Sequence, residues 1–203
     1  RPNFNLLDRF LIMMEQQGVD CIICFSKEDL DEKGEGGKYR QIYENCGYRT
    51  LAVSAKYQRG IGELKELLTG RTTVAAGPSG VGKSSLINCL QSNVVMETGE
   101  ISARIERGKH TTRHSELIDI GENTYILDTP GFSSLGLFDL EKGQLAEYYH
   151  EFEPYEKFCE FGGCSHINER KCGVKDALAE KLVSDIRYEN YCLLYEELSK
   201  MRY

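Results

Sequence analysis

Apolar residues recur along the chain with two different spacings, and their alternation predicts an α/β fold. Helical spacing predicts helices at residues 4–15, 60–68, 84–90, 174–182 and 185–198. Short apolar runs predict strands at residues 19–25, 49–53, 72–76, 116–120 and 123–127. A polar, helix-like stretch up to Asn45 is interrupted by Gly34, Gly36 and Gly37. The alternation implies a mostly parallel sheet with helices on both faces.

Residues 77–84 read Gly-Pro-Ser-Gly-Val-Gly-Lys-Ser and match the phosphate-loop pattern at every fixed position. A predicted strand precedes the stretch and a predicted helix follows it, which is the context that the motif requires. Backbone N–H groups and the helix N-terminus would face the phosphates. The motif predicts a nucleoside triphosphate site, with Lys83 at the outer phosphates and Ser84 on magnesium. The contacting residues would be Gly77, Pro78, Ser79, Gly80, Val81, Gly82, Lys83, Ser84 and Ser85.

Three further short motifs each follow a predicted strand. Lys27 and Asp29 resemble the base-reading motif of GTPases, usually Asn-Lys-x-Asp, whose aspartate accepts hydrogen bonds that guanine can donate and adenine cannot. Ser54, Ala55 and Lys56 resemble the second base-contacting element of GTPases. The stretch from Asp128 to Gly131 resembles their Asp-x-x-Gly element, which helps to hold magnesium and senses the outer phosphate. Each motif alone is weak, but together at strand ends they predict GTP and GDP as ligands.

Ser26 stands where the base-reading motif usually carries asparagine. Serine keeps a hydroxyl but lacks the amide that braces the loop and can contact the base. We therefore expect Ser26 to affect nucleotide affinity more than guanine preference, which Asp29 should still supply.

The order of these motifs is unusual. An ordinary GTPase begins with the phosphate loop and ends with the base-reading elements, whereas here the base-reading pair comes first. The helix at 60–68, which would normally end the domain, leads into its first strand. This order predicts a circularly permuted GTPase domain, a rearrangement that is tolerated because domain ends tend to lie close together.

Four soft ligands lie within fourteen positions near the C-terminus: Cys159, Cys164, His166 and Cys172. Three thiolates and one imidazole suit tetrahedral zinc. Four protein ligands leave no open position, so one structural zinc ion is expected in a small, mainly helical domain at residues 139–203. The alternative is a loop of free cysteines beside a surface histidine.

Permuted GTPase order followed by this Cys–Cys–His–Cys cluster resembles the RsgA (YjeQ) family of small-subunit-dependent GTPases. The resemblance implies a GTPase domain at residues 1–138, followed by the zinc domain. It also implies GTP hydrolysis stimulated by the small ribosomal subunit, contacts with its rRNA and a role in its late maturation. The OB-fold RNA-binding domain that precedes the GTPase in that family has no counterpart in this sequence.

The resemblance places the switch threonine at Thr112, with Thr111 as the alternative; Thr112 would bind magnesium together with Ser84 and Asp128. Phe132 follows Gly131 where many GTPases carry a water-positioning glutamine, so we expect slow intrinsic turnover. His110 is the candidate for that role, with His114 or a ribosomal group as alternatives. The expected catalytic set is Lys83, Thr112, His110, Asp128 and Gly131.

The net charge of −7 argues against a chain that binds nucleic acid over its whole surface, although a local basic contact is compatible with it. No apolar run is long enough to span a bilayer, so we expect no membrane partner. A phosphate loop belongs in a reducing compartment, so we expect a cytoplasmic monomer whose eight cysteines are reduced. One alternative is a GTP-controlled, ribosome-binding assembly module with little turnover. A phosphate-loop kinase or ATPase is disfavoured by Asp29 and by Ser54-Ala55-Lys56.

Overall fold

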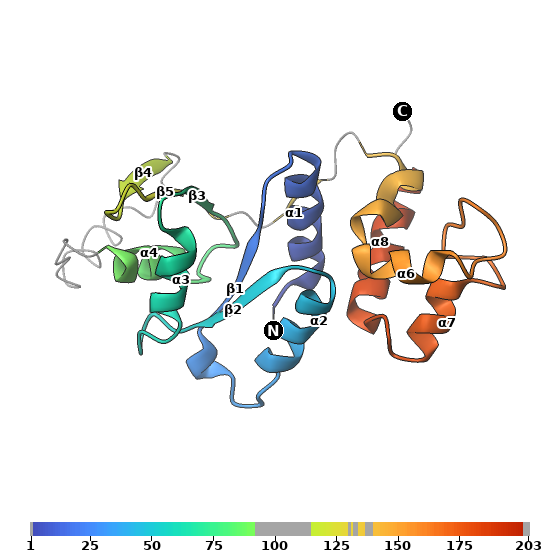
Figure 1. The fold of residues 1–203 in the computed structure, drawn as a ribbon, viewed down its shortest axis with the longest axis horizontal. Coiled ribbons are helices and arrows are strands. Elements are labelled where there is room, and N and C mark those ends of the chain that lie inside the picture. The colour runs from blue at the N-terminus through green and yellow to red at the C-terminus, as the bar shows by residue number, and fades with distance from the viewer. Residues whose placement is uncertain (1, 92–114, 130, 132–133, 137–139, 201–203) are drawn as a thin grey trace. The chain divides into compact units, whose positions relative to one another are not determined.

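The computed structural model describes residues 2–91, 115–129, 131, 134–136 and 140–200 (Figure 1). The chain forms two compact units. The helical unit comprises Arg1–Ile22, Gln41–Arg49 and Ser134–Tyr203, and the phosphate-loop unit comprises Ile23–Arg40 and Thr50–Ser133. Among the helices in the described ranges, none is both long and apolar enough to cross a membrane.

Two strands of the phosphate-loop unit bring the starts of two predicted motifs together at one edge of a sheet. Strands β1 (Ile22–Ser26) and β2 (Arg49–Val53) pair with each other, and a second sheet has the order β3-β5-β4. Strand β3 (Thr72–Ala75) runs parallel to β5 (Tyr125–Asp128), with Ala75 opposite Asp128. Strand β4 (Glu116–Asp119) is antiparallel to β5. The phosphate loop after β3 and the motif after β5 therefore start side by side.

Helical segments follow β1, β2 and the phosphate loop in the described part of this unit. The 3₁₀ turn η1 (Glu28–Leu30) follows β1, α3 (Ile61–Leu68) follows β2, and α4 (Lys83–Leu90) follows the phosphate loop. Residues three or four apart form the apolar stripe of α3, which buries Ile61, Leu64 and Leu68. Helix α4 packs against both α3 and β5, so the helix that begins at the phosphate loop packs against the sheet.

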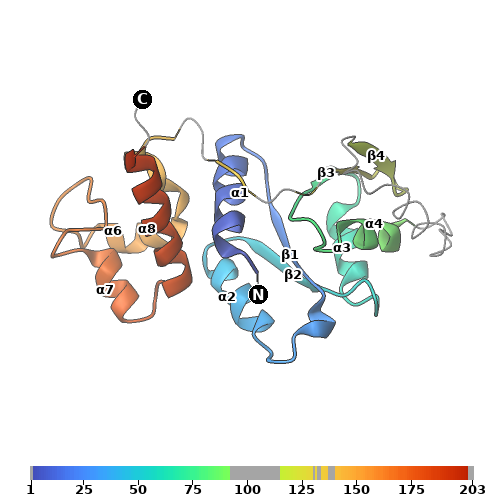
Figure 2. The same cartoon turned by 180° about the vertical axis from the view of Figure 1, so that it is seen from behind.

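The helical unit is formed by segments far apart in the sequence. Helix α1 (Phe4–Gln16) begins at Asn3, whose side chain accepts a hydrogen bond from the Leu6 N–H as an N-cap. Helix α1 lies beside α8 in both views of the ribbon (Figures 1 and 2). The remaining elements are α2 (Gly36–Asn45, shared by both units), η2 (Lys142–Tyr148), η3 (His150–Phe152), α6 (Glu153–Glu156), α7 (Gly173–Ala179) and α8 (Asp185–Lys200).

One hydrophobic core joins α1 to the C-terminal segments. Ile12 of α1 belongs to the same buried cluster as Leu140, Phe152 and Leu194. The other members of that cluster are Leu145, Tyr149, Cys172, Val174, Ala177, Val183, Tyr191 and Leu198. Ile12 of α1 is therefore buried by residues that follow position 139.

A buried ion network lies next to this core. The Arg187 guanidinium on α8 donates to the Asp8 carboxylate at 2.6 Å and to the Glu151 carboxylate at 2.7 Å. Asp8 also accepts from the Tyr43 hydroxyl at 2.8 Å and from the Asn190 amide at 2.6 Å. Burial alone would lower the pKa of Arg187, but the charges of Asp8 and Glu151 hold this pKa well above its ordinary value. The arginine is therefore a permanent cation inside the protein.

Several boundaries differ from those expected from sequence. The first turn of α2 contains Gly36 and Gly37, which were expected to interrupt a helix. Their flexibility is offset by Asp31, whose carboxylate accepts from the N–H groups of Glu35 and Gly36. The two compact units do not divide at residue 138, because α1 joins the C-terminal segments. A functional division at residue 138 stays a prediction.

Replacing Arg187 with methionine should destabilise the protein by about 3–5 kcal/mol, because two buried carboxylates would lose their counter-charge. Urea unfolding measures the loss. The matched control is Lys181→Met, which breaks an exposed ion pair with Asp185 and should cost less than about 1 kcal/mol. Equal losses for the two variants would contradict the importance of the buried network.

Candidate functional site

The phosphate loop connects β3 to the first turn of α4. Gly82 is the N-cap of α4, and Lys83 is its first residue. The Lys83 ammonium donates to the carbonyl oxygens of Gly77 at 2.9 Å and Pro78 at 3.3 Å, so the side chain lies across its own loop. Ser84 and Ser85, in the same helical turn, are exposed. The loop and the helix start thus offer a cation, hydroxyls and a helix N-terminus at one place, as an anionic ligand requires.

The residues after β1 contact this loop directly. The Ser26 hydroxyl donates to the Val81 carbonyl at 2.6 Å. The Lys27 ammonium donates to the Gly80 carbonyl at 2.7 Å. Serine lacks the amide of the usual residue, but its hydroxyl reaches the backbone of the loop because β1 and the loop approach closely. The effect of Ser26 on nucleotide affinity stays a prediction.

The Asp29 carboxylate is held in place by the second base-contacting motif. The Ser54 hydroxyl donates to Asp29 at 2.6 Å, and this bond is the main reason that the pKa of Asp29 lies below its ordinary value. Positive charge on Lys56 lowers the same pKa. Ala55 accepts a hydrogen bond from the thiol of Cys89 on α4, with 3.6 Å between sulfur and oxygen. Asp29, Ser54, Ala55 and Lys56 are thus brought together, and the carboxylate is ionised and fixed in direction.

Asp128 and Gly131 meet the phosphate loop from β5. The Asp128 Oδ1 atom is buried and has no hydrogen-bond partner among the described residues. A Cβ atom on Gly131 would lie 2.7 Å from the backbone nitrogen of Ser79, so only glycine allows this close approach. A buried carboxylate oxygen without a donor, at the end of the strand that pairs with the strand before the phosphate loop, fits a hydrated magnesium ion.

The predicted switch residues lie outside the described residues. These are His110, Thr111, Thr112, His114 and Phe132. Their assigned roles stay predictions from the sequence.

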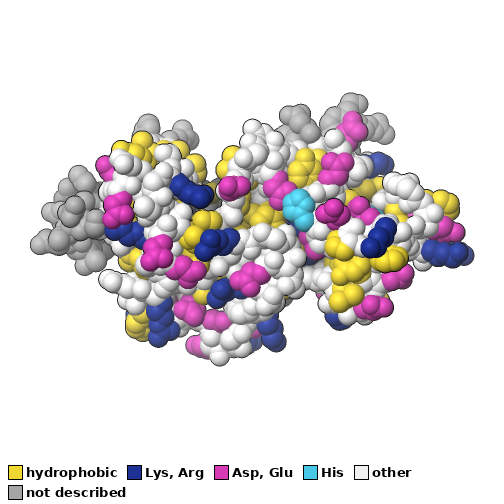
Figure 3. Space-filling model, in the orientation of Figure 1, with side chains coloured by type: hydrophobic (Ala, Val, Ile, Leu, Met, Phe, Trp, Pro, Cys, Tyr) yellow, Lys and Arg dark blue, Asp and Glu magenta, His cyan; other side chains and the backbone are white. Residues whose placement is uncertain are grey.

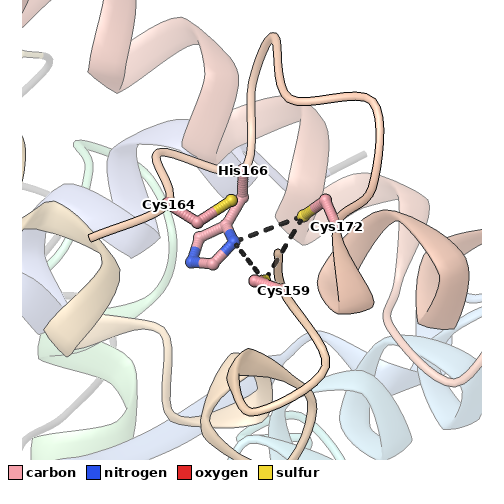
Figure 4. A group of neighbouring side chains, drawn as sticks. All are labelled: Cys159, Cys164, His166 and Cys172. Atoms are coloured by element: carbon pink, nitrogen blue, oxygen red, sulfur yellow. Dashed lines mark hydrogen bonds between the residues drawn. The ribbon is translucent and has the colours of Figure 1, made fainter. Parts of the chain in front are cut away.

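The four soft ligands of the helical unit converge on one point (Figure 4). Their ligand atoms all lie within 4.8 Å of one another. His166 Nδ1 lies 3.4 Å from Cys172 Sγ and 3.7 Å from Cys159 Sγ, and the two sulfur atoms are 3.9 Å apart. A tetrahedral zinc ion, with bonds of about 2.3 Å to sulfur and about 2.0 Å to nitrogen, gives edges of about 3.5–3.8 Å. The cluster therefore has the dimensions of a zinc site.

The protonation states of the cluster agree with a metal site. Burial lowers the pKa of His166, which favours the neutral imidazole that ligates metals. Burial also raises the pKa of Cys164 to about 12 and raises that of Cys172. A cation among these thiols would displace their protons and be bound as a thiolate complex.

Residues outside the ligand set hold the metal loop in shape, and motif spacing did not reveal them. Glu169 accepts from the Ser165 N–H and hydroxyl, both at 2.8 Å, and from the Ile167 N–H at 3.0 Å. Although partial burial would raise it, these bonds lower the pKa of Glu169 to about 2. Glu156 lies 3.5 Å from His166 Nε2, the ring nitrogen that faces away from the sulfurs. Such carboxylates orient a metal-binding histidine.

Helix α8 anchors the same loop through two tyrosines. The Tyr188 hydroxyl donates to the His166 carbonyl at 2.6 Å, and the Tyr191 hydroxyl donates to the Ser165 carbonyl at 2.7 Å. The two bonded pairs are separated by 22 and 26 residues in the sequence, and no local pattern marks the contact. The metal loop is therefore fixed from α8 as well as from within.

Comparison with known proteins identifies the family of this chain. The sequence model of the RsgA GTPase family matches residues 1–138. The chain belongs to the RsgA GTPase family. A member of the RsgA family from Agathobacter rectalis, named small ribosomal subunit biogenesis GTPase RsgA, is 60% identical over 97% of this chain and 65% of its own length. A protein of the same name from Alkaliphilus metalliredigens is 45% identical over 99% of this chain and 69% of its own length.

Solved structures of RsgA relatives share the fold. YjeQ from Thermotoga maritima superimposes with a TM-score of 0.78 at 33% identity, covering 100% of this chain and 68% of that one. YloQ, described as a circularly permuted GTPase, gives 0.75 at 34% identity, covering 100% and 66%. The predicted family and the predicted permuted GTPase fold are confirmed. The chain spans about two thirds of the length of these relatives.

Replacing Ser26 with alanine should weaken GDP binding about fivefold, because the phosphate loop loses its hydrogen bond at Val81. Fluorescence titration with a labelled GDP measures the change. Ser26→Asn should retain binding, and Ser199→Ala, at an exposed position on α8, serves as the control. Unchanged affinity in Ser26→Ala would refute the brace.

Replacing Glu169 with glutamine should lower the stability of the helical unit by about 1–2 kcal/mol, because the new amide group faces an N–H group instead of accepting from it. Thermal unfolding of metal-loaded protein, together with the rate of metal loss to a chelator, measures the effect. Glu180→Gln, at an exposed position, is the control. A variant that unfolds and releases metal as the unmutated chain does would rule out this role.

Proposed function

We propose that this chain binds and hydrolyses GTP as a factor in the late maturation of the small ribosomal subunit. The observation that carries the proposal is the Asp29 carboxylate, which Ser54 orients while the neighbouring Lys27 contacts the phosphate loop. A fixed carboxylate at this position accepts from the N–H and amino groups of guanine, which adenine lacks. The names of the relatives, small ribosomal subunit biogenesis GTPase, support the biological role.

Each residue near the phosphate loop has a proposed task. Lys83 binds the outer phosphates and offsets charge that develops on them. Ser84, Asp128 and Thr112 hold magnesium, which neutralises phosphate charge when it is bound with GTP. The Gly131 N–H senses the outer phosphate, which the close approach of Gly131 to Ser79 supports.

The residue that orients the attacking water is the part of the proposed mechanism that the sequence identifies least clearly. Phe132 cannot orient a nucleophile, so the proposed candidates are His110, His114 or a group supplied by the small subunit. We expect slow turnover by the chain alone and faster turnover on the subunit. Phe132 also favours the second candidate function, a GTP-controlled module that binds the subunit and its rRNA with little turnover of its own.

We propose one zinc ion at Cys159, Cys164, His166 and Cys172. Three thiolates and an imidazole complete a tetrahedron and leave no position for substrate, so the ion stabilises the loop rather than catalysing a reaction. The edge lengths of the cluster support zinc. Because small subunits mature in the cytoplasm, we expect the protein to act there.

The function is tested by measuring hydrolysis of GTP and ATP with and without purified small subunits. We expect slow hydrolysis of GTP alone, a many-fold increase with subunits, and no activity in Lys83→Ala. Asp29→Asn should weaken GTP and favour xanthosine triphosphate, because asparagine reverses one hydrogen bond at the base.

The outcomes separate the candidate functions. Equal use of ATP and GTP would contradict the base-reading assignment. Nucleotide-dependent binding to subunits with negligible turnover would favour the assembly module.

A further inference from the structure

The loop between β2 and α3, residues 54–60, is held in one conformation by its own backbone. Ser54 and Arg59 exchange two backbone hydrogen bonds of 3.1 and 3.0 Å. The Tyr57 N–H donates to the Ser54 hydroxyl at 3.4 Å. A Cβ atom on Gly60 would lie 2.4 Å from the Ala52 carbonyl oxygen, so the chain turns tightly against β2 at a glycine. The residues at the tip are thus presented on a closed, hydrogen-bonded turn.

The tip presents an exposed aromatic ring with two cations close to it. Tyr57 is 55% exposed, and its hydroxyl forms no hydrogen bond to any residue that the structure describes. The Lys56 ammonium lies 5.0 Å from the centre of the ring, and the Arg59 guanidinium carbon lies 5.5 Å from it. All three side chains are exposed. Cation–π contacts restrict the motion of the ring without burying it, so the ring loses little conformational entropy when a partner binds.

This combination favours one class of partner. Unpaired RNA offers flat base faces that stack on aromatic rings or guanidinium planes, next to phosphates that attract lysine and arginine. An acidic peptide would use the two cations but not the ring. An apolar protein surface would use the ring but would bury both cations at a cost.

The positive charge at the tip of this loop is confined to two neighbouring side chains. The chain carries a net charge of −7, and in Figure 3 the Lys and Arg side chains of that face are interspersed with Asp and Glu. Asp29 accepts a hydrogen bond from Ser54 and, in the proposed function, also from guanine. Besides that bond from Ser54, the charges of Lys56 and Arg59 lower the pKa of Asp29. A compact pair of cations beside an exposed ring is therefore a specific feature of this loop rather than part of a generally basic surface.

We propose that residues 56–59 form an RNA contact, in which Tyr57 stacks on an unpaired base and Arg59 and Lys56 bind the flanking phosphates. This inference rests on the proposed function and deepens it, since it names the RNA of the small subunit as a direct partner of the GTPase domain. The contact lies outside the residues that hold the nucleotide, except at Lys56, which borders both.

The test uses the whole 203-residue chain, purified small subunits and a short unpaired RNA, with variants that leave Lys56 intact. Tyr57→Ala should weaken binding about tenfold, the usual effect of removing one stacked ring. Tyr57→Phe should retain binding, and Tyr57→Leu should lose it, because leucine keeps apolar area but has no aromatic face. Arg59→Gln should lower the slope of log affinity against log salt by about one, as for the loss of one phosphate contact.

Arg71→Gln, also exposed in the phosphate-loop unit, is the charge control, and GDP affinity is measured for every variant. Equal weakening by Arg71→Gln would mean that net charge alone is responsible, and retention by Tyr57→Leu would indicate an apolar protein partner. Either result, or an effect confined to GDP affinity, overturns the proposal.

The two proposals fail separately. If unmutated protein binds the short RNA through Tyr57 but does not bind small subunits, the proposed ribosomal role fails, and the contact of Tyr57 with unpaired RNA stands without the small subunit as its source. If it binds subunits equally well in all variants, the reverse holds. Binding to neither overturns both.

Discussion

The helical unit depends on a single buried cation. Arg187 lies between Asp8 and Glu151, with its guanidinium carbon 4.3 Å from the centre of the Tyr149 ring. A buried charge is tolerated only when its hydrogen-bonding capacity is used, and here α1, α8 and η3 all contribute partners. Such a network adds less to the free energy of folding than to the choice of one packing arrangement. Any other packing of these helices would leave a buried charge without a partner. The same helix α8 then carries the tyrosines that anchor the metal loop, so the position of the cluster depends on the helix that Arg187 fixes.

The phosphate-loop unit uses a different principle. Its loops are held by short hydrogen bonds between a side chain and the backbone of a neighbouring loop, as from Ser26 to Val81 and from Lys27 to Gly80. Bonds of this kind can break and re-form as a ligand arrives, whereas a buried ion pair cannot do so cheaply. The helical unit is therefore held by contacts that stay formed, whereas the loops of the phosphate-loop unit are held by contacts that can rearrange when a ligand binds.

Local motifs could be predicted from the sequence, and contacts between distant segments could not. The phosphate loop and the Cys–Cys–His–Cys cluster were found because the spacing of a few neighbouring residues determines their chemistry. The pairing of Asp8 with Arg187 joins residues far apart in the chain and has no local signature. The hydrogen bond from Ser26 to Val81 could not be predicted for the same reason, since it depends on how closely two loops approach. The start of α2 at Gly36 depends on Asp31, whose capping bonds compensate for poor helix formers.

The shared core of α1 and the C-terminal helices also constrains the order in which the protein folds. Translation releases α1 long before it makes Leu140 and Leu194, against which Ile12 packs. At ordinary elongation rates the delay is on the order of ten seconds, during which Ile12 lacks these partners. The phosphate-loop unit can form during this interval, but the helical unit is completed only after the residues of α8 have left the ribosome. Folding of the helical unit therefore depends on contacts between residues far apart in the sequence, and such folding is slow. A protein proposed to act on ribosomes would complete its own folding only when its synthesis on a ribosome is nearly finished.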